Sequence, residues 1–179
     1  RMGHAQRLAS LGRALGFGVT IVEEVQNEDE KASSTAIRQA LRAGEPERAA
    51  EILGSPWIAD GPVMKGEQNG RKFGYPTANT NLGDLIHPKY GVYAVKVRID
   101  RTGDWMPGVA NFGRTPTTGL RDPLLEAHIF DFVGDIYGRW IEVQMLSYLR
   151  PELNFDSLDL MVVQMGKDEI EAKRRLKAS

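Results

Sequence analysis

The sequence predicts a mainly β protein, in which six short strands form an antiparallel barrel or sandwich and a helix follows at the C-terminal end. From Trp57 onward, short apolar runs are separated by Gly and Pro, which is typical of strands. No helical segment stands between these runs, so repeated βαβ units are not expected. Near the C-terminus the apolar spacing changes to that of an amphipathic helix. Closure of the strands into a barrel would remove exposed sheet edges.

The clearest strand pattern is 92–99, where side chains alternate between two faces. One face of it carries Tyr93, Val95, Val97 and Ile99. The six strands are expected at 57–64, directly after Pro76, and at 92–99, 105–112, 124–132 and 140–146.

The C-terminal helix is expected to begin at a cap supplied by Asp156 or Ser157. Gly166 is expected to break or bend it, with Asp168 capping a second piece. Its apolar positions recur at i, i+3, i+4 and i+7, and this Met-rich stripe is expected to pack as core against the barrel. The stripe consists of Leu158, Met161, Val162 and Met165.

The segment ahead of Trp57 has an α/β pattern. Helical spacing over 5–15 ends at Gly16, where a glycine commonly follows a helix. Residues 19–22 have the pattern of a short buried strand.

Two short helices are expected next. The first is capped by Ser33 or Ser34 and ends at Gly44. The second covers 46–53, with Pro46 in its first turn, where proline is favourable.

Composition limits the function classes. The 179 residues are 41% hydrophobic and 26% charged, as in globular proteins, and no apolar run is long enough to span a membrane. No signal-peptide pattern is present at the N-terminus. The absence of cysteine excludes disulfides and thiolate metal sites and fits a cytoplasmic location. A net charge of −1 argues against a nucleic-acid partner.

The segment 66–79 combines features of a phosphate-binding loop. Glycines allow a backbone to turn tightly and bring its N–H groups close to a ligand, and adjacent cations can neutralise phosphate oxygens. The string GxxxxGK[ST] is absent, and a Gly-rich hairpin remains the alternative interpretation. The residues concerned are Gly66, Gly70, Arg71, Lys72 and Gly74.

Pro76-Thr77-Ala78-Asn79 follows the loop. In an extended segment, Thr77 and Asn79 share one face and Ala78 takes the other. Two hard oxygen donors beside a cationic loop suit a Mg²⁺-bound polyphosphate.

GxxxGRxxGYPTAN resembles the signature of riboflavin kinases (flavokinases), including the C-terminal module of bacterial bifunctional FAD synthetases. The strings HPKYGVYAVKV, GVANFGRTPT, LLEAHIFDF, DIYGRWIEV and LRPELNFDSLDLMVVQMGKD follow in the matching order. The resemblance implies a six-stranded Greek-key barrel with a C-terminal helix. It also implies an enzyme that transfers the γ-phosphoryl group of ATP to the ribityl 5′-hydroxyl of riboflavin, which gives FMN and ADP.

The resemblance also implies site residues. Glu126 matches the catalytic base, and Thr77 and Asn79 would bind Mg²⁺. His128 is interpreted as structural. The ATP phosphates would be bound by Gly66, Gly70, Arg71, Lys72, Gly74, Pro76 and Thr77.

For the flavin, the resemblance points to the segments that carry Asn111, Arg114 and Arg150, and to the loop 115–122. Two alternatives stay open from the residues alone. Asn111 fits a turn equally well, and Arg150 fits a salt bridge to Glu152 or another neighbour.

The string Ser33-Ser34-Thr35-Ala36-Ile37-Arg38 resembles the end of the FMN adenylyltransferase domain of bacterial FAD synthetases. There, the Ser and Thr hydroxyls and the Arg (here Arg38) help to hold a triphosphate, whereas simple helix capping is the alternative. Residues 1–55 would then be the C-terminal remnant of a nucleotidyltransferase domain, and 56–179 the kinase. The full-length parent would also adenylylate FMN to FAD.

Two rival functions remain. A noncatalytic flavin- or nucleotide-binding barrel would be favoured by loss of the glycine loop or of Glu126, and both are present. A nucleic-acid-binding barrel would need a basic groove with exposed aromatic residues, and the balanced charge argues against it.

Overall fold

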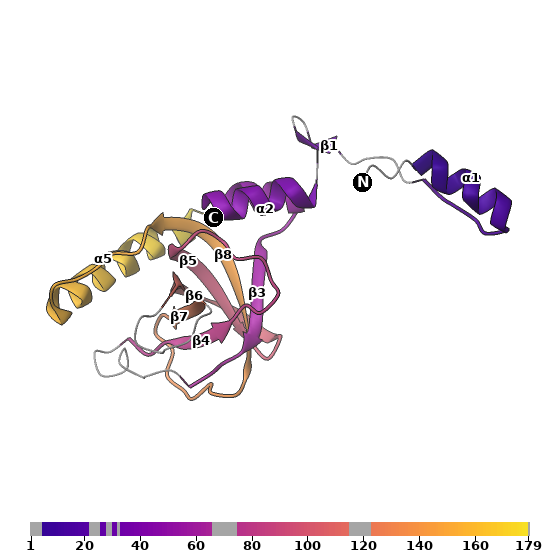
Figure 1. Ribbon diagram of the computed structural model, residues 1–179. Coiled ribbons are helices and arrows are strands. Elements are labelled where there is room, and N and C mark those ends of the chain that lie inside the picture. Colours follow the sequence, from indigo (N-terminus) through magenta and orange to yellow (C-terminus); the bar gives the residue numbers. More distant parts are fainter. Residues whose placement is uncertain are drawn as a thin grey trace. The chain divides into compact units, whose positions relative to one another are not determined.

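The computed structural model describes residues 5–21, 26–27, 30–31, 33–65, 75–114 and 123–178. The chain forms two compact units, residues 1–32 and 33–179 (Figure 1). The first unit contains helix α1 (Ala5–Leu15) and the antiparallel pair β1 (Gln26–Asn27) and β2 (Glu30–Lys31). Gly16 follows α1 in the left-handed conformation, as expected.

The prediction of a strand at 19–22 is wrong for residues 19–21, the part of it that the structure describes. Residues 19–21 have no strand structure, and Ile21 is 53% exposed. An extended segment becomes a buried strand only beside a pairing partner, and among the described residues of this unit none lies beside it.

The second unit begins with two helices whose caps are as expected. Helix α2 (Ser34–Ala43) has Ser33 as its N-cap, whose hydroxyl accepts a hydrogen bond from the Ala36 amide, and it ends at left-handed Gly44. Helix α3 (Pro46–Leu53) begins with its proline and ends at left-handed Gly54. Both helices pack with Trp57 through a small core of Ala40, Leu41 and Ala49.

The six predicted strands are present and form one antiparallel sheet (Figure 1). The sheet has the order β3-β8-β5-β6-β7-β4. β5, β6 and β7 are consecutive neighbours and β8 returns beside β5, which is the Greek-key arrangement. The strands are β3 (Trp57–Pro62), β4 (Ala78–Asn81), β5 (Gly91–Ile99), β6 (Thr102–Gly113), β7 (Leu124–Ile129) and β8 (Trp140–Arg150).

The two edges of this sheet meet, so the fold is a nearly closed barrel. Met64, just past β3, forms an antiparallel bridge with Asn79 of β4. The Thr80 hydroxyl donates a hydrogen bond to the Pro62 carbonyl at 2.8 Å. These contacts decide between the barrel and the sandwich that the sequence left open.

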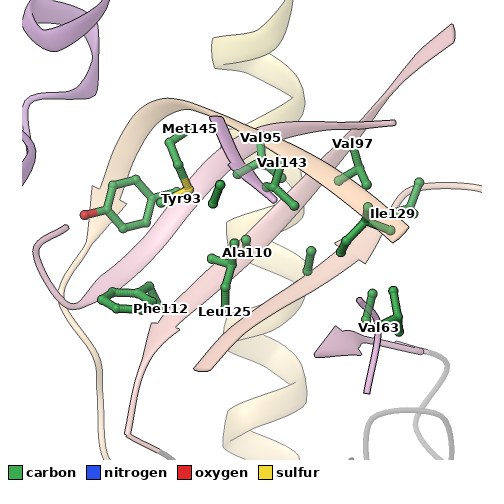
Figure 2. Close-up of a cluster of buried hydrophobic side chains, with 14 of the residues drawn as sticks. Val63, Tyr93, Val95, Val97, Ala110, Phe112, Leu125, Ile129, Val143 and Met145 are labelled. Carbon is green, nitrogen blue, oxygen red and sulfur yellow. The ribbon is translucent and has the colours of Figure 1, made fainter. Parts of the chain in front are cut away.

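Alternating side chains fill the barrel (Figure 2). As predicted, Tyr93, Val95, Val97 and Ile99 point inward together and are at most 8% exposed. Tyr93 donates its hydroxyl to the Lys89 carbonyl at 2.5 Å. Burial raises the pKa of this phenol well above its usual value, with a smaller contribution from Tyr148.

Helix α5 (Leu158–Lys177) covers part of the barrel's outer surface, where Ala172 packs with Ala94 and Phe130. Ser157 is its N-cap and accepts a hydrogen bond from the Leu160 amide. No helix among the described residues is long and apolar enough to cross a membrane.

Two expectations for α5 are corrected. The helix continues through Gly166 without a break, because one glycine costs only about 1 kcal/mol and packing of a 20-residue helix outweighs that cost. Asp168 lies inside α5 rather than at one of its ends, so it is no cap, and it is buried together with Ala172. Leu158 is 58% exposed, and Met161 and Met165 line a cavity rather than filling the core.

Candidate functional site

A cavity of about 240 Å³ lies between the outer surface of the barrel and helix α5. The barrel contributes Glu126, Asn111 and Val109, and α5 contributes Met161 and Met165. We call this space the Glu126 cavity. Its other lining residues are Ala110, His128 and Asp168 from these same elements, and residues from the segment before β4, from β5, from the end of β8 and from 152–155.

One row of cross-strand partners crosses five strands beneath this cavity. Asn79 of β4 pairs with Glu126 of β7, which pairs on its other side with Asn111 of β6. Asn111 pairs with Val92 of β5, and Val92 with Arg150 of β8. Directly opposed residues of a sheet present their side chains on the same face. Four of the five line the Glu126 cavity, while the strand neighbours of Glu126 and Asn111 belong to the barrel core.

Glu126 therefore lies between two polar residues of the neighbouring strands. Its neighbours along β7, Leu125 and Ala127, are at most 1% exposed and point into the barrel. Its partners on both sides, Asn79 and Asn111, carry carboxamides. A carboxylate flanked by two amides on a cavity floor can accept a hydrogen bond or a proton from a ligand hydroxyl.

Thr77 borders two cavities at once. It lines the Glu126 cavity and a second cavity of about 360 Å³, which also touches Ala127, Ile129, Phe132 and Tyr137. We call this second space the Phe132 cavity.

The alternation predicted around Thr77 is confirmed. Ala78 is part of the barrel core, and Asn79 is opposite Glu126 and only 7% exposed. No group of three or more acidic, His or Cys side chains within the described ranges could hold a metal ion. A hard cation here would instead use the oxygens of Thr77, Asn79 and its ligand.

His128 lines the Glu126 cavity and contacts the segment before β4. Its Nδ1 lies 2.9 Å from the Pro76 carbonyl, which only accepts hydrogen bonds, so Nδ1 carries the proton. The ring lies edge-on to Tyr75 and Phe130, with centroids 5.1 and 5.9 Å away. These contacts hold the Pro76–Thr77 segment against β7.

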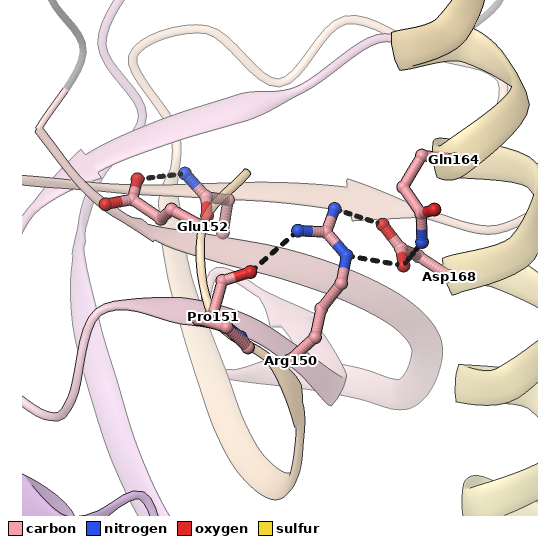
Figure 3. Close-up of polar contacts among 6 residues, drawn as sticks. Arg150, Pro151, Glu152, Gln164 and Asp168 are labelled. Carbon is pink, nitrogen blue, oxygen red and sulfur yellow. Dashed lines mark hydrogen bonds and ion pairs between the residues drawn. The ribbon is translucent and has the colours of Figure 1, made fainter. Parts of the chain in front are cut away.

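Arg150 forms a buried ion pair with Asp168 of α5 (Figure 3). Arg150 Nε donates to Oδ1 at 2.8 Å and Nη2 donates to Oδ2 at 2.6 Å. Nη1 donates to the Pro151 carbonyl, and Gln164 donates to the same carboxylate at 2.9 Å. The guanidinium thus joins the barrel to α5, and the salt bridge that the sequence allowed is made with Asp168 rather than Glu152.

Comparison with known proteins identifies the family to which this architecture belongs. A family model described as riboflavin kinase (flavokinase) matches residues 53–176, which include the barrel and nearly all of α5. The chain belongs to the riboflavin kinase family.

Other similarities agree with this family. The chain is 40% identical over 176 residues to the bifunctional riboflavin kinase/FMN adenylyltransferase of Haemophilus influenzae, covering 97% of this chain and 56% of that protein. It is 38% identical to the protein of the same name from Escherichia coli K12, covering 97% of this chain and 55% of the relative. The chain thus spans about half the length of the curated relatives it matches.

Two solved structures share the fold. A Streptococcus pneumoniae protein described as a macrolide-efflux protein superposes with a TM-score of 0.78 and 37% identity, covering 96% of this chain and 55% of that one. Riboflavin kinase from Trypanosoma brucei has a TM-score of 0.52 at 20% identity, covering 68% and 78%, and supports the fold alone.

The structure brings together part of the site predicted from the riboflavin kinase resemblance. Thr77, Glu126, Asn111 and Arg150 all line the Glu126 cavity, whereas Arg114 is exposed and lines neither cavity. Pro76 lines the Phe132 cavity. Gly66, Gly70, Arg71, Lys72 and Gly74, and the loop 115–122, lie outside the described residues.

The serine-rich string of the predicted adenylyltransferase remnant lies at the start of α2. The Ser33 hydroxyl is used as the helix cap. Ser34 and Arg38 line a groove that runs to Asp84 and His87, and Thr35 is exposed.

Sequence reasoning missed several residues that line the Glu126 cavity. Met161 and Met165 had been assigned to the core, and Asp168 to a cap. A helical stripe shows which residues face the protein, but it does not separate core from cavity wall. The remaining residues had no assigned role, and they are Tyr75, Leu153 and Phe155.

Proposed function

We propose that this chain transfers the γ-phosphoryl group of ATP to riboflavin and releases FMN and ADP. The observation that carries the proposal is the position of Thr77, which lines both the Glu126 cavity and the Phe132 cavity. The chain also belongs to the riboflavin kinase family. A two-substrate transfer needs two binding spaces that meet at the reacting group. Phosphoryl transfer depends mainly on such positioning and on offsetting charge.

Riboflavin fits the Glu126 cavity better than the other. A flat aromatic ring needs apolar walls, and Tyr75, Phe155, Met161 and Met165 supply aromatic and thioether surface. The polar ribityl chain would then lie along the row that contains Asn111 and Glu126. This orientation brings the 5′-hydroxyl to Glu126 and to the boundary at Thr77.

ATP would occupy the Phe132 cavity with its phosphates directed to Thr77. Ile129, Phe132 and Tyr137 offer apolar surface for the nucleoside. Gly66, Gly70, Arg71, Lys72 and Gly74 would contact the phosphates. Mg²⁺, held by Thr77 and Asn79 together with phosphate oxygens, would offset negative charge on the phosphates.

In this arrangement Glu126 accepts the proton of the 5′-hydroxyl group of riboflavin. The 5′-oxygen attacks the γ-phosphorus at the same time. The bond from the γ-phosphorus to the bridging oxygen breaks, and ADP leaves with that oxygen. Asn79 and Asn111 lie opposite Glu126 on the two neighbouring strands. Helix α5 and the segment 152–155 cover the cavity and limit access of water, which would otherwise compete as the acceptor.

We further propose that residues 1–55 derive from the C-terminal part of an FMN adenylyltransferase domain, and that the full-length protein also makes FAD. The support is the length of the relatives and their bifunctional names. The proposed boundary at residue 55 concerns ancestry. It differs from the boundary of the compact units at 32/33, because α2 and α3 pack with Trp57 of the barrel.

The test is incubation of the purified chain with riboflavin, ATP and Mg²⁺, with FMN measured by chromatography. FMN should accumulate only when ATP is present. Riboflavin binding without FMN formation would favour the noncatalytic flavin-binding barrel. A chain that neither binds riboflavin nor makes FMN would contradict the proposal.

A further inference from the structure

Glu152, labelled in Figure 3, lines the Glu126 cavity. Two residues of β6 lie against its carboxylate. Asn111 Nδ2 donates a hydrogen bond to Glu152 Oε1 at 3.3 Å. Two residues further along β6, a Cβ atom on Gly113 would overlap the same carboxylate. Gly113 is outside the left-handed region, so what it provides is space for Glu152 rather than an unusual backbone conformation.

This contact determines how the Asn111 carboxamide is oriented. A carboxylate only accepts hydrogen bonds, so the amide NH₂ of Asn111 must face Glu152. The amide oxygen is therefore turned away from Glu152. Without Glu152, the two ends of the carboxamide would compete for the same place, since they have nearly the same shape.

The amide oxygen belongs to the residue directly opposite Glu126 in the sheet. Opposed residues of antiparallel strands have Cα atoms about 5 Å apart. That separation suits two hydroxyl groups of one ribityl chain, one at each side chain. A hydroxyl group can donate to the Asn111 oxygen while its neighbour donates to Glu126.

We propose that Glu152 is a positioning residue, which holds the Asn111 carboxamide with its oxygen available to accept a hydrogen bond from a ribityl hydroxyl next to the one that is phosphorylated. This inference rests on the proposed riboflavin kinase function. It gives Asn111 a specificity role toward the polyol chain, and it gives Gly113 the role of keeping room for Glu152.

The first experiment measures riboflavin affinity by quenching of flavin fluorescence in the full chain. Glu152→Ala and Asn111→Ala should each weaken binding about 3- to 10-fold, the effect of one hydrogen bond. Gly113→Ala should do the same by displacing the carboxylate. In the double variant, Gly113→Ala should weaken riboflavin binding less than twofold beyond Glu152→Ala alone, because the carboxylate that the new methyl group would overlap is absent. Glu47→Ala, an exposed change on α3, is the control.

The second experiment separates positioning from simple loss of structure, using 2′-, 3′- and 4′-deoxyriboflavin. The original chain should bind 4′-deoxyriboflavin about 3- to 10-fold more weakly than riboflavin, because the 4′-hydroxyl is the one next to the phosphorylated 5′-hydroxyl. The 2′- and 3′-deoxy analogues, which keep that hydroxyl, should bind more nearly as riboflavin does. Asn111→Ala and Glu152→Ala should lose that discrimination, with KM changing more than kcat. Glu152→Gln should keep it, since the glutamine oxygen can still accept from Asn111.

Two results would overturn the inference: equal binding of 4′-deoxyriboflavin and riboflavin by the original chain, or unchanged discrimination in Glu152→Ala. If instead the original chain neither bound riboflavin nor formed FMN, the proposed function itself would fail.

Discussion

The guanidinium of Arg150 and the carboxylate of Asp168 meet in two parallel hydrogen bonds, and this contact fixes the helix that carries Met161 and Met165. The Asp168 side chain is 8% exposed and that of Arg150 is 18% exposed. The pair therefore links the stability of the barrel to the outer wall of the Glu126 cavity.

We predict that Asp168→Ala lowers the free energy of unfolding by about 3 kcal/mol, because it leaves a largely buried guanidinium without its charge partner. Riboflavin binding should weaken in parallel. The double change Arg150→Met with Asp168→Leu should recover most of the stability, since apolar side chains of similar size need no partner. Urea denaturation of the original chain and the two variants provides the measurement. Equal losses in the single and double variants would mean that packing, rather than the ion pair, is responsible.

Glu126→Gln should leave riboflavin and ATP binding intact while it slows FMN formation about 10²- to 10⁴-fold. Gln keeps the shape of the side chain between Asn79 and Asn111 but cannot take a proton at neutral pH. Single-turnover assays with calorimetric binding separate the two effects. Turnover within a few-fold of the original chain would remove Glu126 from the role of base.

Thr77→Ala and Asn79→Ala should weaken MgATP binding much more than riboflavin binding, because the proposed metal ligands lie on the ATP side. Isothermal titration of each ligand separately tests this. Asn81→Ala, which removes the same side chain two residues further along the strand at a position with no proposed ligand role, is the matched control. An equal loss for both ligands would point to a folding defect, and no loss would exclude these residues from the metal site.

The chain should make FMN but no FAD. Adenylyl transfer needs sites for adenine, for the α-phosphate and for FMN. Residues 1–55 offer one serine-rich string, and few apolar side chains are buried among those of them that the structure describes. The purified chain should be supplied with FMN, ATP and Mg²⁺, and FAD and pyrophosphate measured. Sustained FAD formation would show that the first 55 residues are more than a remnant.

Tyr93 should remain protonated in the folded barrel at pH values where exposed tyrosines ionise. Its pKa is raised on folding, so the neutral phenol contributes stability that is complete below the unfolded pKa, about 10, and is lost as the pH rises above it. Absorbance at 295 nm should show one phenol that ionises only together with unfolding. That step should disappear in Tyr93→Phe, and its persistence would assign the signal to another tyrosine.

The barrel and the face assignments were predictable because strand alternation is local. Tyr93, Val95 and Val97 point inward, and Ala78 separates Thr77 from Asn79, as period-2 spacing requires. The same rule explains why Glu126, between two inward-facing residues, reaches the outer surface.

Contacts between segments that lie far apart in the sequence could not be predicted from it. Asp168 bonds to Arg150 because α5 crosses β8, and no local pattern separates that role from a helix cap. Residues 19–21 have an apolar strand pattern but no strand beside them in the described part of their unit. Glu152 and Gly113 meet only because the chain folds back over β6 after β8.

The row from Asn79 to Arg150 also limits how this chain can change by insertion. Because side chains alternate, one extra residue within β4, β6 or β7 would turn its row member into the barrel and bring a core residue to the cavity floor. The pairing of β5 with β8 already shifts in register beside Arg150, so this rule does not extend to β8. The same slip would damage the substrate site and the hydrophobic core together. Length variation among related proteins should therefore be confined to the loops, such as the turn between β5 and β6, and should be absent from the parts of β4, β6 and β7 that contain the row.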